Sequence, residues 1–153
     1  MDKAIKVTLG ALFILLFTQC NNDRIYEEYQ KIKEMGWNVG DSLVYKFPNS
    51  EQMNSGTPLI GIRFNEKYPY SNCYIQLTLK DSLDRVLDKK LINVPLFNSK
   101  TGKPLGKGFG GSYTKLDTIP IQFPSGTNSV TLSPAMREEV LQGIESVGIK
   151  VSR

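Results

Sequence analysis

The chain has 153 residues, of which 40% are hydrophobic and 22% charged, and its formal net charge is +4. This length suits one domain, and the composition excludes a wholly disordered, collagen-like or multi-span membrane protein. The sequence contains no histidine, which excludes His-based catalytic triads and deprives most types of zinc site of a ligand.

The first twenty residues have the features of a secretory leader that ends in cysteine. Lys3 and Lys6 precede residues 7–17, an uncharged segment rich in Leu, Ile, Phe and Val. As a helix this segment would reach roughly 16 Å, about half of a bilayer's hydrocarbon core, so it fits a signal peptide better than a membrane span. Because Cys20 follows almost at once, we expect a bacterial lipoprotein precursor with a signal peptide over residues 1–19 and lipidation of Cys20.

Two other interpretations of this leader stay open. Phe17, Thr18 and Gln19 depart from the small residues that usually precede an acylated cysteine, so a plain cleaved signal or an uncleaved anchor with an incidental cysteine are the alternatives. In the lipoprotein interpretation, residues 20–24 form an acylated polar tether. Cys73 is then the remaining thiol, and we expect a small buried side chain without an intramolecular disulfide.

After the tether, residues 25–35 have an ambiguous pattern that allows one or two helical turns. From Leu43 onward, apolar residues recur with the period of two that is typical of strands. Clusters of Gly, Pro, Asn and Asp separate these segments. We expect strands around residues 43–47, 60–64, 75–79, 86–94, 119–123, 130–132 and 147–151.

These strands predict an all-β domain over residues 25–153. No long helical pattern recurs between them, which argues against parallel βαβ units and favours an antiparallel β-sandwich. A jelly roll is preferred over an immunoglobulin-like sandwich, because the chain ends in a strand that follows a short turn at residues 135–137.

A glycine-rich basic segment, residues 102–111, lacks the spacing of a phosphate-binding loop. No acidic residue lies between Lys90 and Asp117, so the segment is a solvated loop or, alternatively, a basic patch that faces a membrane. The lysines concerned are Lys100, Lys103, Lys107 and Lys115.

The acidic clusters give no catalytic or metal site. Asp81, Asp84 and Asp88 have neither the spacing nor the net charge of a calcium loop, which favours a charged hairpin. Nothing in the sequence brings Asp117 together with Glu138 and Glu139 as an acid–base pair. We therefore predict no enzyme activity, no metal and no cofactor.

Several aromatic residues could form a platform for a sugar or a partner protein, although half-buried core or edge positions are the simpler interpretation. They are Trp37, Tyr68, Tyr70 and Tyr113.

Some of the same residues carry a resemblance to a known family. The chain has Trp37, a YPYSN element at residues 68–72, GKGFG at residues 106–110, and a C-terminal segment that runs from Met136-Arg137 to the LQGIESVGI of residues 141–149. With these motifs it resembles the GldH family of gliding motility lipoproteins from Bacteroidota, over nearly the whole mature chain. The resemblance implies an exported accessory protein of the gliding machinery, with no assigned catalytic residues.

We therefore expect a non-enzymatic, lipid-anchored envelope protein that contacts other envelope or gliding proteins, facing the periplasm. The candidate interaction surface consists of Trp37, Tyr68, Tyr70, Asn72 and Arg137. Nucleic acid is not an expected partner, because removal of residues 1–19 leaves a net charge of only +3, from 17 basic and 14 acidic side chains. The alternative is a ligand-binding β-sandwich that takes glycan or peptidoglycan.

Overall fold

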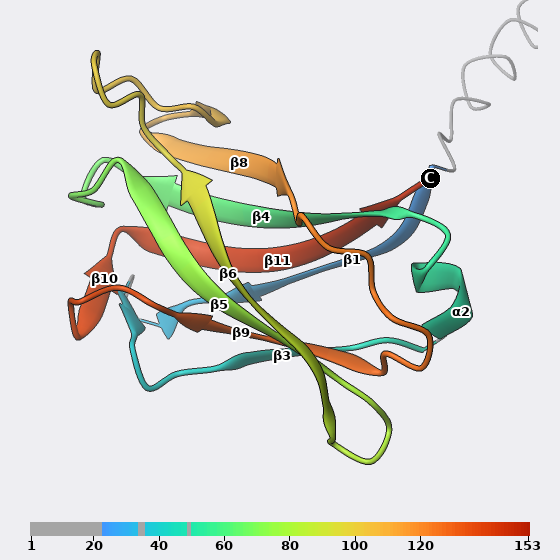
Figure 1. The fold of residues 1–153 in the computed structure, drawn as a ribbon. Helices are drawn as coiled ribbons and strands as arrows, with labels where there is room; N and C mark the ends of the chain where they lie inside the picture. The colour runs from blue at the N-terminus through green and yellow to red at the C-terminus, as the bar shows by residue number, and fades with distance from the viewer. Residues whose placement is uncertain (1–22, 34–35, 49) are drawn as a thin grey trace, which may run out of the picture.

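The computed structural model describes residues 23–33, 36–48 and 50–153 and shows antiparallel strands in two main sheets (Figure 1). One sheet has the spatial order β1 (Arg24–Lys31), β11 (Ile144–Ser152), β4 (Thr57–Asn65), β8 (Ser112–Thr118) and β7 (Lys107–Phe109). The other has the order β3 (Leu43–Lys46), β9 (Ser129–Pro134), β5 (Asn72–Lys80) and β6 (Val86–Pro95). A small third sheet pairs β10 (Val140–Gln142) with β2 (Gly36–Asn38), and α2 (Ser50–Met53) connects β3 to β4.

The two main sheets pack together around one apolar core. Alternate residues of β4, β5 and β11 are fully buried, whereas their neighbours along each strand are mostly more exposed. The Tyr45 hydroxyl donates a hydrogen bond of 2.8 Å to the carbonyl oxygen of Val147 and so joins the sheets. Core residues with no exposed surface include Ile60, Ile62, Phe64, Ile75, Leu77, Leu79, Leu132, Val147, Ile149 and Val151.

This arrangement confirms the prediction of an antiparallel, sandwich-like all-β domain. The strands expected around residues 43–47, 60–64, 75–79, 86–94, 130–132 and 147–151 are present as β3, β4, β5, β6, β9 and β11. The preference for a jelly roll over an immunoglobulin-like topology stays a prediction. Among the described residues, no helix has the length and apolar character that crossing a bilayer requires.

The helical turns considered for residues 25–35 were wrong for residues 25–31, because these residues belong to β1. The strand pairs with β11 from Arg24, opposite Ser152, to Lys31, opposite Ser146. It lies at an edge of its sheet, where Glu27 and Glu28 remain exposed. Because neighbouring residues of β1 are both exposed, its sequence lacks the alternation of apolar and polar residues that is typical of a strand. The segment is extended because it pairs with β11 and not because of its local propensity.

The strand expected at residues 119–123 was also wrong. Ile119 and Phe123 are buried, but this segment belongs to no strand. Pro120 lies inside the alternating run and cannot donate a backbone hydrogen bond to a neighbouring strand. The strand lies just before it instead, as β8, which pairs with β4.

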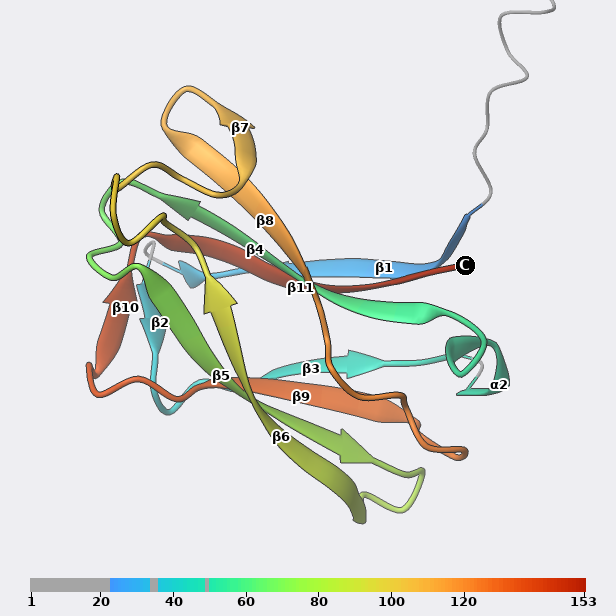
Figure 2. The same cartoon turned by 45° about the horizontal axis from the view of Figure 1, so that its top comes forward.

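One end of the sandwich collects the segments that carry the family motifs. The β4–β5 turn, the β9–β10 connection and β10 lie at the end opposite the C-terminus (Figures 1 and 2). The N-terminal strand starts beside the C-terminus, because Arg24 pairs with Ser152. The candidate surface and the start of the described chain therefore lie at opposite ends of the strands.

Candidate interaction surface

The YPYSN element forms the turn between β4 and β5. Asn65 opens this turn, because its side-chain oxygen accepts a hydrogen bond of 3.0 Å from the backbone N–H of Lys67. The backbone oxygen of Asn65 accepts a second, of 3.1 Å, from the N–H of Tyr68. Asparagine is favoured in turns because its short side chain can bond the backbone in this way.

Tyr68 stabilises the turn from the inside. Its side chain is buried, and its hydroxyl donates a hydrogen bond of 2.9 Å to the carbonyl oxygen of Asn72. Burial raises the pKa of Tyr68 far above its ordinary value, with a further contribution from the neighbouring Cys73. Tyr68 therefore stays a neutral structural residue, and the Asn72 amide is tied to Asn93 of β6 at 2.7 Å.

Tyr70 lies at the centre of the surface. Its hydroxyl donates a hydrogen bond of 2.7 Å to Glu138 on the β9–β10 connection, and this bond raises the pKa of Tyr70. Its ring packs edge-on against Tyr68, with the two centroids 5.8 Å apart. The Tyr70–Glu138 bond thus joins two segments that are 68 residues apart in the chain.

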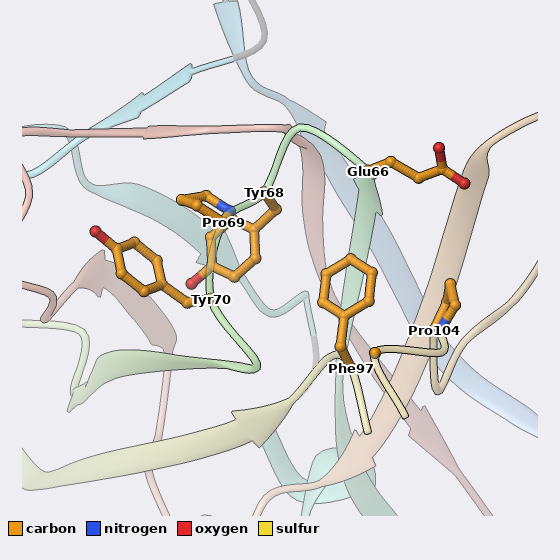
Figure 3. Close-up of a pocket in the computed structure, with 7 residues that line it drawn as sticks. Glu66, Tyr68, Pro69, Tyr70, Phe97 and Pro104 are labelled. Atoms are coloured by element: carbon orange, nitrogen blue, oxygen red, sulfur yellow. The ribbon is translucent and has the colours of Figure 1, made fainter. Parts of the chain in front are cut away.

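Three shallow hollows share Tyr70 as a wall. The first, of about 330 Å³, also contains Tyr68, Pro69, Phe97 and Pro104, with Glu66 at its rim (Figure 3). The second, of about 370 Å³, is mainly apolar and is lined by Tyr74, Ala135, Met136, Arg137 and Glu138. The third, of about 320 Å³, extends toward β10.

The structure brings together part of the predicted set. Tyr70 and the exposed Arg137 line the same hollow, whereas Asn72 lines none of the three. Trp37 is 1% exposed and belongs to the core. It pairs with Leu141 across β2 and β10, and its indole N–H donates a hydrogen bond of 3.1 Å to the carbonyl oxygen of Asp41.

Other residues of the surface were missed. The alternation of β5 turns Cys73 and Ile75 inward and therefore places Tyr74 outward, a signal that was present in the sequence. Met136 lies against the same strand, with its sulfur 3.3 Å from the backbone nitrogen of Tyr74. For Phe97 and Glu66, no sequence pattern indicated that the fold would place them beside the YPYSN turn.

The C-terminal motif supports this turn directly. Gly143 has a φ of +79°, and a Cβ atom there would overlap the backbone nitrogen of Tyr68. The carbonyl oxygen of Gly143 accepts a hydrogen bond of 2.9 Å from the N–H of Asn65. The YPYSN element and the LQGIES segment are therefore in direct backbone contact.

Glu145 closes the network behind the turn. Its carboxylate accepts hydrogen bonds from Ser112 at 2.6 Å, Asn65 at 2.9 Å and Arg63 at 3.0 Å. Burial opposes ionisation of Glu145, but these bonds and the Arg63 charge outweigh it and lower its pKa. Through these hydrogen bonds the carboxylate links β4, β8 and β11. A carboxylate with this many hydrogen-bond partners has the features of a structural group.

The other candidate chemical groups also have structural partners. Asp81 accepts hydrogen bonds from the backbone N–H groups of Leu83 and Arg85 and forms an ion pair with the Arg85 side chain at 2.7 Å. These contacts stabilise the β5–β6 turn. Cys73 is buried, and burial raises its pKa to about 11 although a Tyr68 hydrogen bond acts in the opposite direction. Within the described ranges, no three metal-ligating side chains cluster together.

Comparisons with known proteins agree with the motifs. Residues 24–151 match the profile of a family described as GldH lipoprotein. The chain is also 27% identical to a gliding motility lipoprotein GldH homolog from Christiangramia forsetii, in an alignment of 164 residues that covers all of this chain and 98% of the relative. The family match includes both the YPYSN turn and the C-terminal segment that supports it.

Proposed function

Because the chain belongs to the GldH lipoprotein family, we propose that it is a non-catalytic, lipid-anchored envelope protein that docks on other proteins of the gliding machinery. The match to the family over residues 24–151 is the observation that carries this proposal. The hydrogen bonds of Glu145 and Asp81 and the burial of Cys73 support the non-catalytic part, because each of these groups has a structural role in the fold.

The proposed organisation is a signal peptide over residues 1–19, an acylated tether over residues 20–24, of which Arg24 is also the first residue of β1, and the β-sandwich over residues 25–153. The leader lies outside the described residues, so its support comes from the sequence and the family. Two or three acyl chains on Cys20 would give firm attachment, since one chain binds a membrane only marginally. A Cys20→Ala variant is expected to leave the membrane fraction, and the domain is proposed to face the periplasm.

The proposed docking surface is the region around Tyr70 and Arg137. Tyrosine and arginine are enriched at the centres of protein interfaces, where they combine apolar contact with directed hydrogen bonds. The adjoining hollow is mainly apolar, with Tyr74 and Met136 in its wall. A partner side chain that enters it would be desolvated beside the Arg137 guanidinium and the Glu138 carboxylate, which favours a partner with a complementary polar group.

The test is complementation of a deletion strain, scored by colony spreading and movement of surface markers. Arg137→Glu, which reverses a charge on an exposed residue, is expected to reduce both while the protein level and membrane retention stay normal. Leu83→Ser, which changes an exposed residue in the β5–β6 turn at the far end of β5 from this surface, is the matched control. Normal spreading of the Arg137→Glu strain would exclude this surface from the function.

One observation favours a second function, a glycan- or peptidoglycan-binding module. The Figure 3 hollow has the rings of Tyr68, Tyr70 and Phe97 in its wall and a carboxylate, Glu66, at its rim. Sugar rings stack on aromatic faces and hydrogen-bond to such carboxylates. NMR titration with soluble peptidoglycan fragments is the test, and shifts confined to residues 66–70 and 97–104 would support it.

A further inference from the structure

The hairpin formed by β7 and β8 exposes an aromatic side chain at its tip. Phe109 is 97% exposed, more than any other large hydrophobic residue among those described. Gly110 and Gly111 follow with φ values of +66° and +82°, the positive values that a tight two-residue hairpin turn requires. Figure 2 shows that this hairpin projects beyond the body of the sandwich.

Close packing holds the hairpin in this form. Phe109 pairs with Ser112, and Lys107 pairs with Thr114. A Cβ atom on Gly108 would overlap the Ser112 carbonyl oxygen, and one on Gly106 would lie 2.7 Å from the carbonyl carbon of Thr114. Because Gly106 and Gly108 have no side chains, β7 can lie directly against β8. This pairing holds Phe109 in a fixed position with its side chain exposed to solvent.

Lysines are concentrated in the hairpin and in the loop before it, whereas the carboxylates nearby, Glu145 and Glu66, are hydrogen-bonded to Ser112 and Tyr113 on β8. Residues 91–116 contain four lysines and no acidic residue. Lys107 precedes Phe109 by two positions, so both side chains lie on the same face of the strand. Lys100 and Lys103 are exposed on the preceding loop, which is closed by the bridge between Phe97 and Pro104.

We propose that this hairpin is a second membrane contact, in which Phe109 enters the interfacial region of an anionic phospholipid bilayer and the lysines face its phosphates. A single exposed aromatic residue next to a two-residue turn forms no groove for a protein partner, whereas a bilayer requires no matching shape. Apolar tips with neighbouring cations bind anionic lipid surfaces through both burial and charge. The inference rests on the proposed lipid anchor, which holds the domain beside the membrane.

The two contacts would fix the orientation of the domain. β1, which starts just after the tether, and β7 lie at opposite edges of the same sheet. They also lie toward opposite ends of the strands, because Arg24 pairs with Ser152 of β11 whereas Ser112, beside the hairpin tip, pairs with Asn65, near the Ile144 end. Strand spacing and rise put the two contacts roughly 30 Å apart, so the sandwich would lie along the membrane.

The experiment places an environment-sensitive thiol dye at the tip of the acylated full-length protein. The variant Phe109→Cys offers an accessible thiol, since Cys73 is buried. The protein is reconstituted into phosphatidylcholine vesicles with or without phosphatidylglycerol, and the dye emission is recorded with a lipid-borne quencher. The matched control is the same dye on Leu91→Cys, an exposed apolar position on β6.

With phosphatidylglycerol present, the dye at position 109 is expected to shift to the blue and to be quenched, while the dye at position 91 stays in water. Lys103→Gln with Lys107→Gln is expected to lower the ratio of bound to free hairpin roughly fivefold per lysine at low salt. The pair Lys89→Gln and Lys90→Gln on β6 controls for the lost charge and is expected to change nothing.

Equal emission from positions 109 and 91 would overturn the proposal, as would shielding of the dye only after envelope proteins are added, which would indicate a protein partner. Vesicle flotation of the wild-type protein separates the two claims. A protein that floats but leaves position 109 in water keeps its anchor and loses the hairpin contact. A protein that fails to float loses both.

Discussion

The ring of Tyr29 in β1 lies over Gly148 of β11, its direct partner in the strand register, and extends to Gly61 of β4, the next partner across the sheet. A Cβ atom on Gly148 would lie 2.5 Å from Tyr29 Cδ1 and 2.7 Å from the carbonyl oxygen of Glu28. At Gly61 the three nearest atoms all belong to Tyr29. Two adjacent glycines thus make room for one aromatic ring on the outer face of the sheet.

This contact predicts different costs for alanine at the two glycines. Gly148→Ala is expected to lower the free energy of unfolding by about 1–3 kcal/mol, and Tyr29→Ala should relieve that cost only in part, because the Glu28 backbone also obstructs the methyl group. For Gly61→Ala, Tyr29→Ala should relieve most of the cost, since only a side chain must move. Urea denaturation of the single and double variants measures both couplings. If the two alanine variants lost the same stability, and if Tyr29→Ala changed neither loss, the result would contradict this packing of Tyr29 on the two glycines.

Gly143 gives a second prediction, because both its conformation and its surroundings exclude a side chain. Gly143→Ala is expected to cost about 3 kcal/mol or more, from a positive φ and from overlap with the backbone of Lys67 and Tyr68. Gly126→Ala is the matched control: its φ is +84°, but no atom lies within 4 Å of the added carbon, so it should cost about 1–2 kcal/mol. Thermal denaturation of both compares them, and similar losses would argue against the contact between the motifs.

Much of this fold was predictable, and the exceptions have physical reasons. β4, β5 and β11 are central strands with one buried face, so their alternation of apolar residues is clear in the sequence. β1 and β8 have many half-exposed residues, so their sequences lack clear alternation. Their extended conformation depends on hydrogen bonding to the central strands β11 and β4, respectively. Residues 119–123 show the reverse case, in which alternating apolar residues fill the core but Pro120 interrupts strand pairing.

The candidate site was less predictable than the fold. The sequence singled out Tyr70 and Arg137 but gave no sign that Tyr70 bonds Glu138, because that contact depends on the tertiary arrangement of two distant loops. Trp37 lies in a three-residue strand, which is too short for a burial pattern to be read. Its place in the core follows from its pairing with Leu141 of β10.

Glu145 predicts how stability depends on pH. Its pKa is lower in the folded state than the unfolded value of about 4.3, so its contribution is present above that value and is lost as the pH falls through the folded pKa. Glu145→Gln should destabilise the protein near neutral pH by about 1 kcal/mol. The difference from wild type should shrink below about pH 4.

Urea denaturation at several pH values measures this difference. Glu139→Gln, at an exposed position beside β10, serves as the control and should show little loss at any pH. A difference for Glu145→Gln that stays constant down to pH 3 would show that the charge of Glu145 is not what holds β4, β8 and β11 together.

The thiols give a prediction that also bears on the anchor. Cys73 is buried and its pKa is about 11, so roughly one molecule in a thousand carries the thiolate at pH 8. A disulfide reagent such as DTNB should therefore find no reactive thiol in the folded, membrane-extracted protein and one thiol per chain after denaturation. Two thiols after denaturation would mean that Cys20 is not acylated, and rapid reaction of the folded protein would contradict the burial of Cys73.

The most direct test of the whole account is site-specific photo-crosslinking in the native envelope, followed by mass spectrometry. A photoreactive residue at Arg137, beside Tyr70, is expected to capture a defined envelope protein, whereas the same residue at the exposed Leu83, in the β5–β6 turn at the far end of β5, should not. Capture of the same background proteins from both positions, or of none from Arg137, would contradict a docking surface around Tyr70.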